Sequence, residues 1–287
     1  MSLESPAMAM WTPDGHRYYF GMPTQSTLPS GCYRIYADAQ NQISACIDNL
    51  SFNKNVVYHK QIFDLLNDIN RFFNSKRYYQ KLQIPHKHGI LIHGRPGSGK
   101  TSLLEATLVS LNATNNYIII NIVNEDPLHV IDFCTSYRTI DPFKNIIIAF
   151  ENLERQLDQF GMHNWIQLFD GISKLGNIAF IGTTSRYDLL PIELRTVGGK
   201  FDVKYEISDL DSETRRAVVE DMIASAHKNV KKLWPSERID QVVIDTNNFT
   251  IGVLQELLVL LLIYQHDYDE ALRNMSEKNK QIGFRPY

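Results

Sequence analysis

The sequence predicts an α/β fold, in which a mainly parallel sheet with helices on both faces precedes a small helical domain. Between His88 and Ile207, short apolar runs alternate with stretches of helical periodicity, as in parallel sheets whose strands are joined by helices. After Ser208 the periodicity is almost entirely helical. Before position 54, polar and apolar residues alternate, as in a short β-rich N-terminal region. The predicted domains are residues 1–53, 54–207 and 208–287.

The N-terminal region is predicted to contain a β-hairpin. The segment CYRIYADAQNQISACIDNLSF alternates in polarity and has turn-forming residues from Asp38 to Gln42. From Tyr58 the period changes to that of a helix, which we expect to continue to about Asn74. Pro85 ends any helix that follows.

Four apolar segments are predicted to be the strands of the parallel sheet: GILIHG, YIIINIV, NIIIAF and IAFIGTT. Between them, helices are expected to begin near three positions: Gly99, Leu128 and Asn164. In the C-terminal domain Ser212 is the expected N-cap of a helix, and two further helices are expected near Ser236 and Ile251.

Composition and charge are those of an ordinary soluble globular protein. The 287 residues are 44% hydrophobic and 21% charged, with a formal net charge of −3. The net charge gives no reason to expect a nucleic-acid partner, and the sequence has no dense Lys/Arg block. No nucleic-acid partner is expected. The N-terminus lacks the pattern of a secretory signal. We therefore expect a soluble intracellular protein, with the cytoplasm as the favoured compartment.

Neither membrane insertion nor a disulfide framework is expected. The most apolar helical run, Gly252 to Gln265, contains Gln255 and Glu256 and is too short for a bilayer span. The chain has three scattered cysteines. A reduced interior is therefore favoured over a pairing of Cys32 with Cys46 across the hairpin.

The segment GRPGSGKTS matches the phosphate-loop pattern G-x-x-x-x-G-K-[ST] in full. An apolar strand precedes it and a helical stretch follows. Phosphate binding requires this order, because small residues let backbone amides close around the phosphates and the helix N-terminus adds positive potential. Lys100 is expected to reach the β- and γ-phosphates, and the Thr101 hydroxyl to bind Mg²⁺. The sequence therefore predicts that ATP is bound by nine residues: Gly94, Arg95, Pro96, Gly97, Ser98, Gly99, Lys100, Thr101 and Ser102.

Polar residues follow two of the predicted strands. Glu151 and Asn152 follow NIIIAF, where nucleotide-hydrolysing enzymes place one acid for Mg²⁺ and another for the attacking water. Glu151 is thus a predicted metal ligand, together with the loop threonine. Ser185, after IAFIGTT, is expected to orient the attacking water. Arg195 is expected to reach the γ-phosphate on a neighbouring subunit as an arginine finger.

Together these motifs resemble those of AAA ATPases, which join a P-loop NTPase domain of α/β fold (the AAA large domain) to a helical lid domain. Over roughly residues 54–275 the chain is similar to the mitochondrial Bcs-type chaperones. The similarity rests on FFNSKRYYQKLQIPHKHGILIHGRPGSGKTS and on FENLE, which stands where that subfamily has L-E-D-[VI]-D. NWIQLFDGI and FTIGVLQELLVLLLIYQHDYDEAL resemble two of its helices.

The resemblance implies a ring of six or seven subunits that uses ATP to act on a protein client. Its best-known members move a folded Rieske iron–sulfur protein across the inner mitochondrial membrane. The sequence departs from this pattern in three places. We expect no N-terminal membrane span, no aromatic residue occurs from Asn124 to Leu128 to grip a peptide in a pore, and Lys200 replaces a second arginine finger.

Asn152 leaves two functions open. An amide can hydrogen-bond water but cannot accept its proton near neutral pH, and loss of a general base slows a reaction by about a hundredfold to ten-thousandfold. The chain is predicted to be either a slow ATPase, which Ser185 and Arg195 favour, or an ATP-binding assembly module that hydrolyses little. Glu154 is a substitute base, although we expect it to face a neighbouring subunit or solvent. The acidic charge disfavours a nucleic-acid-handling AAA protein.

Overall fold

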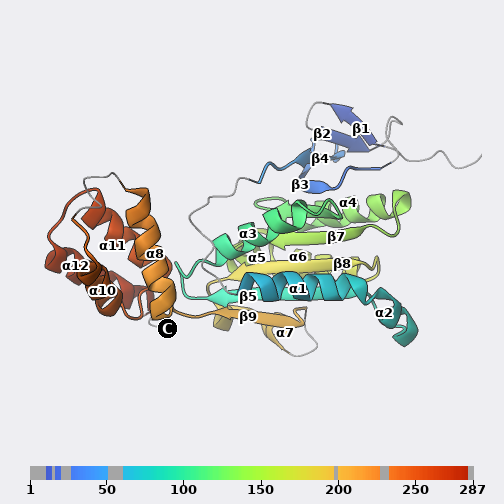
Figure 1. Ribbon diagram of the computed structural model, residues 1–287. Helices are drawn as coiled ribbons and strands as arrows, with labels where there is room; N and C mark the ends of the chain where they lie inside the picture. The colour runs from blue at the N-terminus through green and yellow to red at the C-terminus, as the bar shows by residue number, and fades with distance from the viewer. Residues whose placement is uncertain are drawn as a thin grey trace, which may run out of the picture. The chain divides into compact units, whose positions relative to one another are not determined.

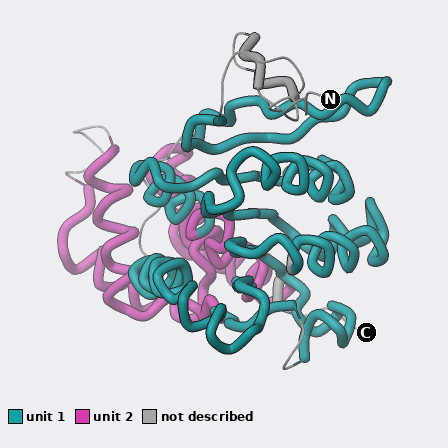
Figure 2. Tube along the Cα trace, turned by 90° about the vertical axis from the view of Figure 1, so that its right-hand side faces the viewer, with its two compact units in different colours: residues 1–52, 61–92, 104–205 teal, residues 53–60, 93–103, 206–287 magenta. Residues whose placement is uncertain are grey.

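The computed structural model describes residues 11–14, 17–20, 27–50, 61–196, 200–226 and 233–283. The chain divides into two compact units (Figure 2). The first comprises residues 1–52, 61–92 and 104–205, and the second comprises residues 53–60, 93–103 and 206–287. The domain limit predicted at residue 53 lies outside the described residues.

Among the described residues, nine strands form one sheet in the order β1-β2-β4-β3-β6-β7-β8-β5-β9 (Figure 1). Their bounds are β1 (Trp11–Asp14), β2 (Arg17–Phe20), β3 (Gly31–Ala37), β4 (Ile43–Ile47), β5 (Lys87–Gly94), β6 (Tyr117–Ile122), β7 (Asn145–Phe150), β8 (Ile178–Thr184) and β9 (Val203–Ile207). The predicted α/β fold is confirmed.

The central strands β3, β6, β7 and β8 are parallel to one another. Their isoleucine-rich sequences are buried almost throughout, which suits strands covered on both faces. The four predicted strand segments coincide with β5 to β8 within two residues. The described register between β7 and β8 ends with the pair Phe150 and Gly182. Strand β7 ends at this pair, whereas β8 continues to Thr184.

The N-terminal strands continue this sheet. Strands β3 and β4 form the predicted antiparallel hairpin, and the Asp38 carboxylate stabilises its turn by accepting hydrogen bonds from the backbone N–H groups of Gln40 and Gln42. Strand β3 then pairs in parallel with β6. The described cysteines are free thiols.

Helices occupy most of the remaining described residues. Their bounds are α1 (Gln61–Asn74), α2 (Lys76–Leu82), α3 (Lys100–Asn112), α4 (Pro127–Ile140), α5 (Leu153–Phe160), α6 (Met162–Ser173), α7 (Ile192–Arg195), α8 (Ser212–Ser225), α10 (Ser236–Asp245), α11 (Ile251–Leu262) and α12 (Tyr268–Gly283). Helices α3, α4 and α6 begin within two residues of the predicted positions. Helix α5 was not predicted, because its eight residues follow a strand end almost directly.

Aromatic side chains fix the end of β7 against helix α6. Trp165 and Phe169 on α6 are fully buried. The ring of Phe150, the last residue of β7, meets the Trp165 ring edge-on at a centroid distance of 4.8 Å, and Phe169 meets Phe180 of β8 in the same way at 5.0 Å. Edge-to-face pairs of this kind are favourable beyond the area that they bury. The residues after β7 therefore start from a rigid position.

Among its described residues after β9, the second unit contains helices α8, α10, α11 and α12 around an apolar core of its own. The N-cap of α8 is Asp211, whose carboxylate accepts a hydrogen bond from the Thr214 N–H at 2.7 Å. The prediction of Ser212 as N-cap is therefore wrong by one residue. Among the described helices, none combines the length and the apolar composition that a membrane crossing requires.

Candidate nucleotide site

The segment from the end of β5 to α3 contains two glycines at which the backbone leaves little room for a side chain. Gly97 has a φ of +75°, which is strained for residues with a side chain, and its carbonyl accepts a hydrogen bond from the Gly252 N–H at 2.9 Å. At Gly94 a Cβ atom would lie 2.5 Å from the carbonyl oxygen of Ile207. The backbone itself therefore requires glycine at these two positions of the motif.

Lys100 is the first residue of α3 and is only 6% exposed. Its Nζ donates hydrogen bonds to the carbonyl oxygens of Gly94 and Arg95, at 2.9 and 2.8 Å, and lies 3.5 Å from the Ser98 hydroxyl. The ammonium group therefore lies inside the loop that is predicted to bind phosphate.

The other predicted loop residues differ in exposure. Ser98 is buried, Pro96, Gly99 and Ser102 are half-buried, and Thr101 is exposed. Thr101 lies in the first turn of α3, and its role as a ligand of Mg²⁺ stays a prediction.

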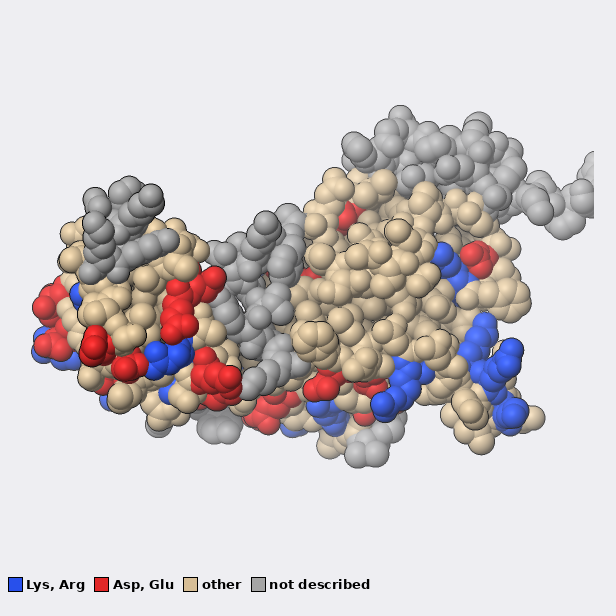
Figure 3. Space-filling view, viewed as in Figure 1, with Lys and Arg blue, Asp and Glu red and all other residues tan. Residues whose placement is uncertain are grey.

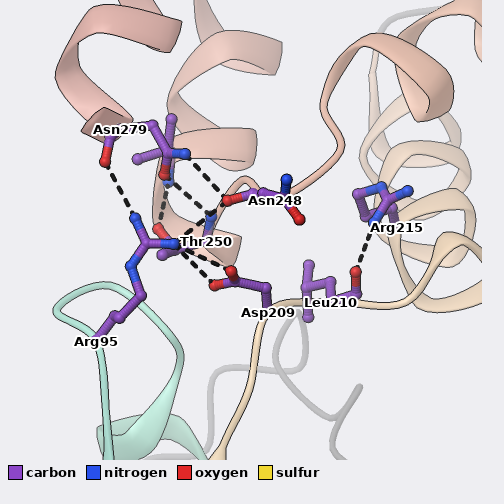
Figure 4. A network of polar contacts seen from close by, with 8 residues as sticks. Arg95, Asp209, Leu210, Arg215, Asn248, Thr250 and Asn279 are labelled. Carbon is purple, nitrogen blue, oxygen red and sulfur yellow. Dashed lines mark hydrogen bonds and ion pairs between the residues drawn. The ribbon is translucent and has the colours of Figure 1, made fainter. Parts of the chain in front are cut away.

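The Arg95 side chain points out of the loop toward residues far along the sequence (Figure 4). Its guanidinium donates to both carboxylate oxygens of Asp209, at 3.1 and 3.0 Å, and to the carbonyl oxygen of Asn279 at 3.0 Å. The Asn248 carbonyl lies at 3.5 Å and accepts a second bond from the Asn279 side-chain amide. Because the guanidinium is engaged by these groups, we expect the predicted nucleotide contact of Arg95 to be made by its backbone.

In the first unit, Glu151 and Asn152 follow β7 directly. Glu151 is half-buried and Asn152 is exposed. Asn152 has φ 49° and ψ 59°, in the left-handed region that Asn tolerates better than most residues do. The chain therefore turns sharply at Asn152, and α5 begins at the next residue.

This turn brings Glu154 to the end of β8. Its Oε1 accepts a hydrogen bond from the backbone N–H of Ser185 at 3.0 Å, so the expectation that Glu154 faces a neighbouring subunit or solvent is wrong. The reason is α5, whose first turn was not predicted. In return, the Thr183 hydroxyl accepts a hydrogen bond from the Asn152 N–H at 3.0 Å. Ser185 itself is half-buried.

Glu105 is a candidate residue that the sequence analysis missed. It lies on α3 four residues after Thr101, and residues with this spacing share one face of a helix. Burial, and after it the charge of Glu151, raise the pKa of the Glu105 carboxyl. Carboxylate oxygens are ligands that Mg²⁺ binds, so Glu105 and Glu151 fit a divalent cation. The spacing from Thr101 is the signal that would have identified Glu105.

Arg195 ends the short helix α7. Its carbonyl accepts hydrogen bonds from the Lys204 ammonium and the Tyr187 hydroxyl, and its Nε is buried without a hydrogen-bond partner among the described residues. Lys200, which stands at the second finger position, forms an ion pair with Asp170 on α6. The finger role of Arg195 stays a prediction, and residues 197–199 lie outside the described part of the chain.

In the view of Figure 3, charged side chains of both signs gather on parts of the surface, and a broad area carries few of them. No continuous stripe of Lys and Arg crosses the described residues drawn there. A basic stripe is the usual mark of a nucleic-acid-binding surface, and this face therefore gives that interpretation no support.

Comparison with known proteins gives the family context of this geometry. Residues 90–209 match the family model for the ATPase family associated with various cellular activities (AAA). The Corynebacterium kroppenstedtii protein named "AAA ATPase forming ring-shaped complexes" is 23% identical over 210 residues, which are 64% of this chain and 36% of that protein. The Dictyostelium discoideum "Probable mitochondrial chaperone BCS1-A" is 25% identical over 158 residues, 50% of this chain and 37% of that protein. The chain spans about a third of the length of each relative.

A solved structure shares the fold. One chain of the E. coli MS115-1 HORMA:CdnC:Trip13 complex superposes with a TM-score of 0.58 at 13% identity, over 81% of this chain and 90% of that chain. The sequence relatives belong to several AAA groups at similar identity, so they support the family and do not single out the Bcs-type chaperones. The match of residues 90–209 therefore indicates an AAA family domain in this part of the chain.

Proposed function

We propose that this chain binds ATP with Mg²⁺ and hydrolyses it slowly. The observation that carries the proposal is the loop after β5, where buried Lys100 is held by the carbonyls of Gly94 and Arg95. The loop leads directly into α3, whose N-terminus adds positive potential. A lysine and a helix N-terminus arranged in this way suit the β- and γ-phosphates of a nucleoside triphosphate.

Thr101 and Glu151 would hold the magnesium ion, and Glu105 would add a further carboxylate near it. When bound, the ion supplies positive charge to phosphate oxygens that become more negative during transfer. Burial, and after it the charge of Glu151, raise the pKa of the Glu105 carboxyl. This supports the assignment, because a cation beside two carboxylates relieves their repulsion.

Slow rather than fast hydrolysis follows from Asn152. Its exposed amide can position the attacking water by hydrogen bonding, as can Ser185, but it cannot accept the proton. Positioning and charge stabilisation dominate phosphoryl transfer. We therefore expect turnover to continue without a general base, at a reduced rate.

The chain would further assemble with copies of itself into a ring of six or seven subunits and act on a protein client as a chaperone or remodeller. The support is the naming of one relative for ring-shaped complexes and of another as a chaperone. In such a ring Arg195 would supply positive charge to the γ-phosphate bound by the neighbouring subunit. Sedimentation as a monomer at micromolar concentration with saturating ATP would contradict the ring.

A second function is an ATP-binding assembly module that scarcely hydrolyses. Asn152 favours it, because this module needs the phosphate loop but no proton acceptor. The two functions share nucleotide binding and differ in turnover.

Phosphate release by the purified chain with ATP and Mg²⁺ tests the proposal. We expect repeated turnover in the wild type and none in Lys100→Ala, with exposed Lys174→Ala as the surface control. ATP binding without turnover in the wild type would select the assembly module. Absence of binding in the wild type would overturn both functions.

A further inference from the structure

The ends of β7 and β8 are joined by two reciprocal hydrogen bonds. The Asn152 N–H donates to the Thr183 hydroxyl oxygen, and the Ser185 N–H donates to Glu154 Oε1, both at 3.0 Å. Each bond therefore links the backbone of one strand end to a side chain of the other. We call Asn152, Glu154, Thr183 and Ser185 the strand-end brace.

The described register between β7 and β8 does not reach these residues. It ends with Phe150 and Gly182, and two residues later Asn152 adopts a left-handed φ of 49°. Gly182 lies under the Phe150 ring, so closely that a Cβ there would be 2.1 Å from a ring carbon. The ring packing fixes the last sheet pair, and the brace extends the connection beyond it.

The two side chains that accept the hydrogen bonds of the brace are wholly or partly shielded from water. Thr183 is 1% exposed, and Glu154 is half-buried. The second carboxylate oxygen of Glu154 is buried and has no hydrogen-bond partner among the described residues. Both hydrogen bonds are partly buried. Because shielding from water strengthens a hydrogen bond electrostatically, these two bonds can hold the strand ends at a fixed separation.

We propose that Glu154 and Thr183 are positioning residues for ATP hydrolysis, which act by fixing Asn152 relative to Ser185. This inference rests on the proposed function of the site. Asn152 and Ser185 are the two groups assigned to the attacking water, and they belong to different strand ends. Their separation decides where the water is held, and a misplacement of about 1 Å can lower a reaction rate by about a hundredfold.

The geometry assigns Glu154 the role of hydrogen-bond acceptor rather than proton acceptor. One of its carboxylate oxygens is occupied by the Ser185 N–H, and the other is shielded from solvent. Glutamine has nearly the same shape and can offer its carbonyl oxygen to the same N–H, whereas alanine offers nothing. Thr183→Ser and Thr183→Val form the equivalent pair for the hydroxyl.

The test compares kcat and the KM for ATP in these four variants of the full chain. Asp158→Ala, at an exposed position on α5, is the control. We expect Glu154→Ala and Thr183→Val to lower kcat by about 10- to 100-fold while KM changes less than about threefold. Glu154→Gln and Thr183→Ser should recover most of this loss. The double variant Glu154→Ala/Thr183→Val should lose less than the product of the single losses, because the brace acts as one unit.

Circular dichroism at the assay temperature distinguishes loss of folding from loss of positioning. Thr183→Ser keeps the hydroxyl, so it tests the hydrogen bond even if Thr183→Val fails to fold. Unchanged kcat in folded Glu154→Ala and Thr183→Val would overturn this inference and leave the proposed function intact. A kcat as low in Glu154→Gln as in Glu154→Ala would also overturn it, since the charge would then matter rather than the hydrogen bond. A wild type that binds ATP without turnover would overturn the proposed hydrolysis, and the inference with it.

Discussion

The phosphate loop and the strand-end brace differ in how their parts come together. The loop is a single uninterrupted segment, from Gly94 to Ser102. The brace joins pairs of residues that are 31 positions apart in the sequence. In the loop the backbone and one lysine are the proposed phosphate-binding groups, whereas in the brace each bond needs a particular side chain.

This difference decides what a sequence can reveal. The covalent chain fixes the spacing of the loop residues, so the loop appears in the sequence as a recognisable pattern. The brace exists only because parallel strands β7 and β8 are neighbours and because Asn152 turns the chain into α5. A single residue such as Glu154 belongs to no sequence motif that would reveal its contact with Ser185.

The largest effect is expected in the loop. Lys100→Ala removes an ammonium group that lies inside the loop. A hydrogen bond to a charged group contributes about 1.5–3 kcal/mol, so the Kd for ATP should rise by roughly 10- to 100-fold. Equilibrium binding of a fluorescent ATP analogue measures the change. An unchanged Kd would show that the loop does not bind nucleotide as proposed.

The next effect concerns the packing at the base of the brace. Gly182→Ala forces a methyl group against the Phe150 ring, and overpacking a buried site typically costs about 1–3 kcal/mol. Gly171→Ala on α6 is the matched control, because its added methyl meets Ile131 at an ordinary 3.6 Å and a helix gains about 0.5–1 kcal/mol from this change. Denaturant unfolding should show opposite signs. Equal stability of the two variants would mean that Phe150 can move aside.

Much of the fold could be predicted, because its strands carry strong local patterns. The segments of β5 to β8 are runs of Ile, Leu and Phe, which few structures other than buried strands accommodate at this length. Strand β9 was not identified, because its residues Val203 to Glu206 are only partly buried or exposed. Helix α5 was missed because a left-handed residue, rather than a long connection, separates it from β7.

The candidate site was predictable to different depths. The loop residues follow from the motif, and Glu151 and Asn152 from their place after a strand. Glu105 could have been identified from its spacing to Thr101. The contacts of the Arg95 and Glu154 side chains could not be derived, because they depend on residues that only the fold brings near. The expectation that Glu154 faces a neighbouring subunit or solvent is wrong, because the sequence did not predict the first turn of α5.

Asn152→Asp separates the backbone role of this residue from its side-chain role. Its N–H makes the brace bond, so the substitution leaves the brace unchanged, and Asp also tolerates the left-handed conformation. The new carboxylate supplies a proton acceptor, and general-base assistance typically contributes at least about a hundredfold. We expect the ATPase rate at saturating ATP to rise at least about tenfold.

Glu154→Gln in the original background is the control for that measurement, and it should change the rate little. Saturating ATP is needed because the added charge of Asn152→Asp repels the γ-phosphate and weakens binding. An unchanged rate in Asn152→Asp, together with a lost rate in Glu154→Gln, would make Glu154 the base. That outcome would contradict both the role of Asn152 and the brace.

The smallest effect is expected at Arg95. Like the residues of the brace, it makes side-chain contacts with residues that are distant in the sequence. Its side chain pairs with Asp209 and the Asn279 carbonyl, and partly exposed ion pairs contribute about 0–1 kcal/mol. Arg95→Met should therefore lower stability by no more than about 1 kcal/mol and change the Kd for ATP less than about fivefold. Arg95→Lys keeps the charge but lacks the second nitrogen that reaches Asn279. The stability of this variant should therefore fall between those of the wild type and Arg95→Met. A loss of ATP affinity as large as in Lys100→Ala would instead make the Arg95 side chain a nucleotide contact, as the motif alone predicts. The role of Arg95 would then follow from the sequence, unlike that of Glu154.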